Sequence, residues 1–204
     1  MAVRSKGEDK ERRIVSAATV LFTRYGFKRT SVELLASEAN VAKPTIYAYF
    51  RDKDAIFSAV VAAVCSELLA AAESASRGRG TLTERLTGML SAKFTRYWEL
   101  VQASPHAQEL LDSQGALGGD VIEKNDRAFL ALLVSALEGA DELDLDSHDL
   151  TTTSAAQLLL RVAYGASYDA TSVTNHRKHI AEAVRMVVAG MCRGEAPRWK
   201  RRGG

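Results

Sequence analysis

The stretch from Val32 to Phe50, VELLASEANVAKPTIYAYF, predicts two short helices joined by a tight turn. Its first half carries apolar residues at spacings of three and four, as one face of a helix requires. Asn40 stands where the turn needs a residue that tolerates a positive φ, and Pro44 suits the first turn of the second helix. Ile46 and Phe50 are four residues apart and should face the preceding helices. A helix held in this way fits the major groove of DNA, so we expect a helix-turn-helix.

Polar and aromatic groups remain on the outer face of the second helix. Lys43 can pair with a phosphate or a guanine edge, and Thr45 offers a hydroxyl and a methyl group to a base. The hydroxyls of Tyr47 and Tyr49 can reach phosphate oxygens, although ordinary surface or half-buried aromatic residues are the plainer interpretation. Lys53 begins the next helix, where a cation and free N–H groups both favour a phosphate. The predicted DNA contacts are Thr30, Ser31, Lys43, Pro44, Thr45, Tyr47, Tyr49 and Lys53.

Charge is unevenly distributed along a chain of otherwise ordinary globular composition. The chain has 204 residues, of which 47% are hydrophobic and 25% are charged. Residues 1–53 hold eleven Lys and Arg against six Asp and Glu, whereas the remainder holds sixteen against nineteen. A basic first quarter on an acidic body indicates contact with a polyanion. For the basic residues near the N-terminus, a solvated charged arm is favoured over minor-groove or phosphate contacts; these residues are Arg4, Lys6, Lys10, Arg12 and Arg13.

The N-terminal residues lack the apolar run of a secretory signal. The longest nearly apolar run, Ala55 to Cys65, is interrupted by Ser58 and is too short to span a bilayer. We therefore expect a cytoplasmic protein with no membrane partner. Cys65 and Cys192 have no metal-type spacing and are expected to be buried or half-buried thiols, with a redox-sensing pair as the alternative.

Helical periodicity continues almost to the end of the chain, and no strand pattern alternates with it. Thr81 and Glu84 form a predicted capping box after a linker at 74–80. An acidic loop is expected at 141–149. The pattern predicts an all-α fold of about nine helices, near 14–25, 32–39, 44–50, 53–74, 82–101, 105–114, 120–137, 152–168 and 174–191. It also predicts a DNA-binding domain over 1–53, a larger helical domain over 54–192 and a basic tail over 193–204.

The run from Ile14 to Val60 resembles the N-terminal domain of the TetR family of bacterial transcriptional regulators. The segment from Ala18 to Phe27 matches A-x-x-L-F-x-x-x-G-F/Y, and the T-S-V at 30–32 opens the second helix. V-A-K-P-T-I-Y-A-Y-F at 41–50 and R-D-K-D-A-I at 51–56 follow in the same order and spacing. Asn40 replaces the usual Gly, and Asp54 stands where Glu is more frequent; Asn tolerates left-handed geometry.

The resemblance implies an all-α regulator with a helix-turn-helix domain and a larger helical domain. It also implies a homodimer in which the last two long helices form a four-helix bundle with their counterparts. The apolar faces of these helices are wide enough to pack on their own body and on a partner. The dimer interface predicted on this basis contains Leu158, Val162, Ala166, Ile180, Val184 and Val187.

A small molecule that binds in the larger domain and releases the DNA is the third implication of the resemblance. Large residues at helical spacing are individually more often core than ligand wall, but together they could line a cavity. Trp98 and Tyr164 are preferred because each combines a large apolar body with a polar tip. The predicted pocket contains Phe94, Trp98, Val101, His106, Leu110, Phe129, Leu133, Tyr164 and Tyr168, and it indicates an apolar or aromatic effector.

Other classes of site have little support in the sequence. His176 and His179 are three residues apart and Glu182 lies one turn further on, but no fuller metal-ligand set accompanies them. No nucleophile, phosphate-loop or dinucleotide motif occurs, so we expect neither an enzyme nor a cofactor. The hypothesis is a ligand-responsive dimeric regulator, a repressor, that binds a palindromic operator in double-stranded DNA. The alternatives are a helical small-molecule carrier or enzyme that uses the fold as a scaffold, and a DNA-binding protein without a ligand.

Overall fold

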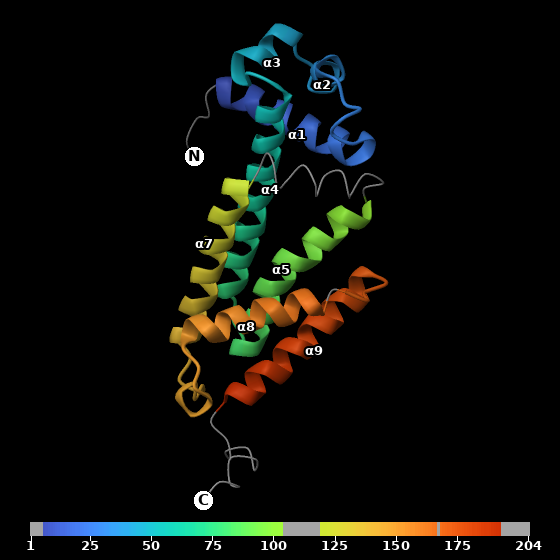
Figure 1. The fold of residues 1–204 in the computed structure, drawn as a ribbon. Helices are drawn as coiled ribbons and strands as arrows, with labels where there is room; N and C mark the ends of the chain where they lie inside the picture. The colour runs from blue at the N-terminus through green and yellow to red at the C-terminus, as the bar shows by residue number, and fades with distance from the viewer. Residues whose placement is uncertain (1–5, 104–118, 167, 193–204) are drawn as a thin grey trace, which may run out of the picture. The chain divides into compact units, whose positions relative to one another are not determined.

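The computed structural model describes residues 6–103, 119–166 and 168–192, and every regular element in this part is helical (Figure 1). This confirms the predicted all-α class. One isolated bridge joins Leu143 to Cys192. The helices are α1 (Lys6–Tyr25), α2 (Val32–Glu38), α3 (Lys43–Tyr49), α4 (Lys53–Ser76), α5 (Leu82–Ala103), α7 (Gly119–Glu138), the 3-10 turn η1 (Asp146–His148), α8 (Thr152–Gly165) and α9 (Val173–Met191).

Most predicted helices lie within a few residues of the observed bounds. Helix α4 continues to Ser76, so it includes the first residues of the predicted linker. Helix α8 ends at Gly165, about three residues earlier than expected, because the next amides close turns; Tyr168 N–H donates to the Gly165 carbonyl at 3.1 Å. The short helix predicted from Pro105 falls outside the described residues.

Local capping explains where several helices begin. The Ser31 hydroxyl accepts from the Leu34 N–H at 3.2 Å at the start of α2, and an Asp52 carboxylate oxygen accepts from the Ala55 N–H at 2.7 Å near the start of α4. At α5 the Thr81 N–H donates to the Glu84 carboxylate at 2.8 Å, while the Glu84 N–H donates to the Thr81 hydroxyl. Backbone N–H groups at the start of a helix have no partner within the helix, and the capping side chains accept their hydrogen bonds.

The chain forms two compact units, each with its own apolar core. Unit 1 contains residues 1–67 and 99–126, and unit 2 contains residues 68–98 and 127–204. The unit 1 core is built on α1 to α4 and includes Ile14, Phe22, Leu35, Ile46, Ile56 and Phe57. The unit 2 core includes Leu86, Met89, Leu90, Leu133, Leu159 and Ile180, and α8 packs against α9 within it.

Helix α4 is longer than the apolar run seen in the sequence. By length and composition alone it could cross a membrane, with a mean hydropathy of 2.1 in its most apolar window. Its residues instead enter both cores, Ile56, Phe57, Val60 and Val61 in unit 1 and Ala72 in unit 2. Helices buried in a protein core share this apolar composition, so we interpret α4 as a core helix.

Candidate nucleic-acid interface

Helix α3 is held in position by apolar side chains that pack into the core of unit 1. Ile46 is fully buried on its inner face, and Phe50, just after its last residue, is 7% exposed. Both belong to the same core cluster as Leu35 of α2. Between α2 and α3, Asn40 takes a φ of 51°, the left-handed geometry for which an Asn is suited. The predicted helix-turn-helix geometry is therefore present, and it orients one face of α3 outward.

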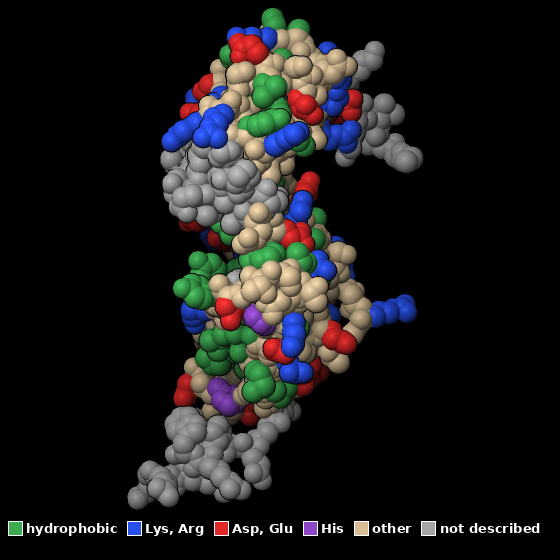
Figure 2. Space-filling model, turned by 90° about the vertical axis from the view of Figure 1, so that its right-hand side faces the viewer, with side chains coloured by type: hydrophobic (Ala, Val, Ile, Leu, Met, Phe, Trp, Pro, Cys, Tyr) green, Lys and Arg blue, Asp and Glu red, His purple; other side chains and the backbone are tan. Residues whose placement is uncertain are grey.

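The outward face of α3 carries the side chains that the sequence indicated. Tyr47 is 48% exposed and Tyr49 is 36% exposed, and Lys43 and Pro44 at the helix start are also exposed. Thr45 is half-buried. The space-filling view shows charged side chains of both signs on the visible face of the part of the molecule that contains these helices (Figure 2). Large apolar bodies with polar tips beside a Lys are suited to a DNA backbone and groove edge.

Lys43 is paired with Glu33, which the sequence analysis did not single out. The Lys43 ammonium donates a hydrogen bond to a Glu33 carboxylate oxygen, and it lies 6.0 Å from the centre of the Tyr47 ring. Hydrogen bonding from Lys43 lowers the pKa of Glu33 to about 2, with further contributions from its own backbone N–H and the Ser31 hydroxyl. The same hydrogen bond raises the pKa of Lys43. Both groups are therefore charged near neutral pH.

Thr30 was predicted to contact DNA, and the structure contradicts this. Its side chain is 1% exposed, and its hydroxyl donates to the Gly26 carbonyl at 2.8 Å. Gly26 ends α1 with a φ of 83°, and Thr30 closes the loop behind it. The Thr30 hydroxyl is enclosed in this loop and bonded to it, so the side chain does not face outward. Its neighbour Ser31 is exposed and caps α2.

Lys53 was predicted to offer a free ammonium to a phosphate, and the structure gives that group other partners. Its Nζ donates to the carbonyl of Phe27 at 3.0 Å and to that of Thr30 at 3.2 Å, and it lies 3.5 Å from the carbonyl of Lys28. It also lies 4.5 Å from the centre of the Phe27 ring. Lys53 thus fastens the start of α4 to the loop between α1 and α2.

Arg13 is hydrogen-bonded to the backbone of this chain, whereas the sequence analysis considered it part of a solvated charged arm. Its guanidinium donates to the carbonyls of Ala39 and Asn40, at 2.5 and 2.8 Å. These are backbone acceptors at the end of α2, where carbonyls lack partners within the helix. Arg12, by contrast, forms an exposed ion pair with Asp9 on its own helix.

The predicted pocket residues of unit 2 are only partly brought together. Phe94 contacts Tyr164 edge-to-face with ring centres 6.4 Å apart, whereas Phe129 and Leu133 are buried in the core. Tyr168 is 97% exposed, so it lines no pocket in this chain, because it follows the end of α8 in a surface turn. The predicted positions Val101, His106 and Leu110 fall outside the described side chains.

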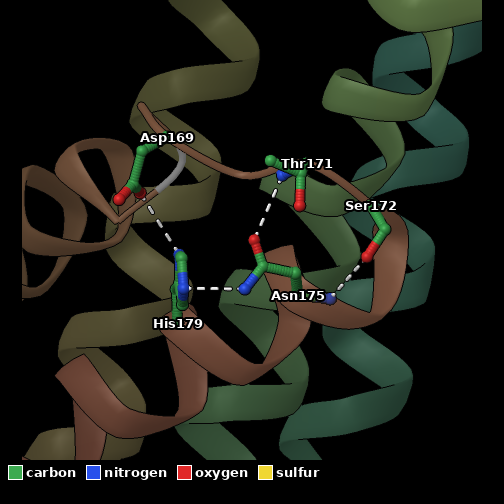
Figure 3. A network of polar contacts seen from close by, with 5 residues as sticks. All are labelled: Asp169, Thr171, Ser172, Asn175 and His179. Carbon is green, nitrogen blue, oxygen red and sulfur yellow. Dashed lines mark hydrogen bonds and ion pairs between the residues drawn. The ribbon is translucent and has the colours of Figure 1, made fainter.

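A buried polar contact lies beside Trp98. His176 is fully buried, its Nδ1 lies 3.0 Å from the Thr95 hydroxyl, and its ring centre is 5.5 Å from that of Trp98. His179 has separate partners: Nδ1 lies 3.3 Å from an Asp169 carboxylate oxygen and Nε2 lies 2.8 Å from the Asn175 side-chain nitrogen (Figure 3). The two histidines therefore have different surroundings. Within the described ranges, no group of three or more His, Cys, Asp or Glu could hold a metal ion.

The predicted dimer positions on α8 and α9 divide into two groups. Ile180 and Val184 are fully buried in the core of unit 2, so they cannot face a partner as expected. The wide apolar face of α9 made both sides look equivalent, and packing on α8 decided which side is inward. The positions Leu158, Val162, Ala166 and Val187 stay half-buried, and Tyr164 and Met186 are 72% and 70% exposed. Hydrophobic side chains are accordingly visible at the surface of unit 2 (Figure 2).

Helix α3 packs its inner face on two other helices and exposes its outer face, and a larger helical body follows. This arrangement defines the class of helix-turn-helix DNA-binding proteins. Residues 14–60 match the family model described as bacterial regulatory proteins, tetR family. The chain is 30% identical over 132 residues to an uncharacterized HTH-type transcriptional regulator, YhgD of Bacillus subtilis (strain 168), covering 64% of this chain and 68% of that protein. The chain belongs to the TetR family of bacterial transcriptional regulators.

Solved structures share the fold over most of the chain. A transcriptional regulator from Cytophaga hutchinsonii ATCC 33406 superposes with a TM-score of 0.71 at 16% identity, covering 90% of this chain and 99% of the other. The fatty acid degradation regulator FadR from Bacillus halodurans has a TM-score of 0.63 at 18% identity, with 93% and 98% covered. At these identities the likeness shows the fold alone.

Proposed function

We propose that this regulator is a ligand-responsive repressor that acts in the cytoplasm and binds a palindromic operator as a homodimer. The observation that carries the proposal is α3, whose buried Ile46 fixes a face on which Lys43, Tyr47 and Tyr49 are exposed. Each protomer inserts this face into the major groove, with half-sites about one helical turn or a little more apart. The proposed DNA contacts are Ser31, Lys43, Pro44, Thr45, Tyr47 and Tyr49.

The dimer proposed here uses the exposed sides of α8 and α9. Met186 and Tyr164 are large apolar side chains left mostly exposed, and Leu158, Val162 and Val187 on the same two helices are partly exposed. Isologous packing of these helices would bury such side chains in a four-helix bundle. The functional division into a DNA-binding domain at 1–53 and a body at 54–192 belongs to the same proposal.

The effector proposed is an apolar or aromatic small molecule held in the helical body. Phe94, Trp98 and Tyr164 supply aromatic surface there, two of them with a polar tip. The ligand would favour a state in which the α4 helices of the two protomers hold their α3 helices at a separation unsuited to the operator. A coupling free energy of about 1–3 kcal/mol is typical of such linkage.

Two variants of the α3 face test the DNA-binding part of the proposal. An operator is first selected from random duplexes, and its affinity is then measured by fluorescence anisotropy at several salt concentrations. Tyr47→Ala and Lys43→Ala should weaken operator binding while the melting temperature and the dimer remain unchanged. Tyr168→Ala is the matched control, because it removes an exposed tyrosine from unit 2.

The outcome separates the proposal from its alternatives. Steep loss of affinity with rising salt is expected, since each neutralised phosphate releases counterions. A wild-type protein that ignores duplexes at low salt would favour a carrier or enzyme built on the same scaffold. Unchanged operator affinity in both α3 variants would remove α3 as the reading helix.

A further inference from the structure

Glu33 places a carboxylate on the surface that the proposed function turns towards DNA. It is the second residue of α2, its side chain is 63% exposed, and its carboxylate is bonded to the ammonium of Lys43, the first residue of α3. A carboxylate in this position repels the phosphate backbone unless a cation or donor covers it. The pairing of Glu33 therefore determines how this surface meets a duplex.

The ion pair affects every phosphate contact that Lys43 could make. An exposed ion pair contributes little net free energy, so a phosphate can displace Glu33 from Lys43. That exchange, however, leaves the Glu33 carboxylate unpaired beside a polyanion. The net gain from a phosphate contact is correspondingly reduced, and this reduction applies equally to every DNA sequence because phosphates carry no sequence information.

One major-groove edge matches both members of the pair. A G·C base pair presents the N7 and O6 acceptors of guanine next to the N4 donor of cytosine. Lys43 can donate to the guanine acceptors while Glu33 accepts from the cytosine N4 group, so neither charge is left without a partner. An A·T pair offers the ammonium only single acceptors, adenine N7 and thymine O4, one on each side of the adenine N6 donor, and it adds the thymine methyl group, so it suits Lys43 less well than the two adjacent guanine acceptors do.

We propose that Glu33 is a specificity-determining residue that reads a G·C base pair jointly with Lys43 and keeps Lys43 from binding phosphates indiscriminately. This inference rests on the proposed DNA-binding function and adds to it the base pair and the residue that selects it. The ring centre of Tyr47 lies 6.0 Å from the Lys43 Nζ, so this tyrosine is also close to the pair. Glu33 and Lys43 thus contact one base pair together, from the adjoining helices α2 and α3.

Glu33→Gln tests the inference, with Glu38→Gln as the matched control. Both residues are exposed on α2 and both substitutions remove one negative charge, but it is Glu33 that forms the ion pair with Lys43. Each variant is titrated with a random duplex and with operators in which every position of a half-site is changed in turn. Melting curves establish that the variants are folded.

We expect three results for Glu33→Gln that Glu38→Gln does not share. The salt slope on random duplex steepens by about 0.9 for each protomer bound, because Lys43 is released to a phosphate. A fourfold dilution of salt then increases its affinity about three- to fourfold more per protomer than that of wild type. At one G·C position, where wild type loses at least about fivefold in affinity on change to A·T, the loss is reduced.

The double variant Glu33→Gln, Lys43→Met completes the cycle. If Glu33 acts through Lys43, adding Glu33→Gln to Lys43→Met changes the salt slope no more than Glu38→Gln does. Identical behaviour of Glu33→Gln and Glu38→Gln on random and altered operators would overturn the inference while leaving the DNA-binding function in place. A wild-type protein that binds no duplex would instead overturn both.

Discussion

Replacing Lys53 with Met tests whether this residue fastens the fold or binds DNA. The substitution retains most of the apolar stem and removes the ammonium. Two hydrogen bonds, to the Phe27 and Thr30 carbonyls at 3.0 and 3.2 Å, are lost together with the contact to the Phe27 ring at 4.5 Å. Each hydrogen bond contributes about 0.5–1.5 kcal/mol net and the cation–π contact about 0.5–1 kcal/mol.

The summed loss is about 3 kcal/mol in the free energy of unfolding, which the 3.5 Å contact with the Lys28 carbonyl changes little. For a chain of this length that corresponds to a fall of about 6–12 °C in melting temperature. Calorimetry gives the melting temperature, and anisotropy at several salt concentrations gives the slope of DNA binding. We expect lower stability and an unchanged slope.

Lys43→Met is the control with the opposite expectation. Lys43 is exposed on the outer face of α3, so its loss should leave the melting temperature nearly unchanged and weaken operator binding. A stable Lys53→Met protein with a reduced slope would refute the reasoning. Lys53 would then be the phosphate ligand that its place at a helix start suggested.

Three further predictions concern single groups. Thr30→Val should lower the free energy of unfolding by about 1–2 kcal/mol in urea titrations, since a buried hydroxyl no longer donates to the Gly26 carbonyl; a loss of operator affinity without loss of stability would contradict this. The pKa of Glu33 is lowered from 4.5 to about 2, so its contribution to stability is fully present above pH 4.5 and disappears as pH falls through about 2. Carboxyl NMR titration should show this midpoint, and Lys43→Met should move it upwards towards 4.5. Thr81→Ala removes the cap of α5 and should cost about 1 kcal/mol in chemical denaturation; hydrogen exchange should quicken in the first turn of α5 and stay unchanged in α8.

Local sequence signals predicted the helices and the reading face. Periodicity and caps depend on neighbours within a few residues, and therefore the Thr81–Glu84 box appears where it was expected. The same holds for the turn at Asn40. The alternation of inner and outer positions along α3 was visible for this reason too, because Ile46 and Phe50 recur with the helical period.

Contacts between residues far apart in the sequence were not accessible from periodicity. Thr30 and Ser31 are adjacent hydroxyl residues, yet one is enclosed by the end of α1 and the other is exposed. Arg13 reaches carbonyls 26 and 27 residues away, and Lys53 reaches back 26 residues to Phe27. A charged side chain looks free in a sequence until the acceptor that another helix supplies is known.

By itself, then, the sequence determined an all-helical chain with a helix-turn-helix whose outer face is polar and aromatic, since hydrophobic spacing and backbone preferences are local. Only the tertiary structure decided which charges remain available. Packing of α2 on α3 brought Glu33 to Lys43, and packing of α9 on α8 turned Ile180 and Val184 inward. The physical reason is that burial and ion pairing depend on distances in space, which a helical period does not specify.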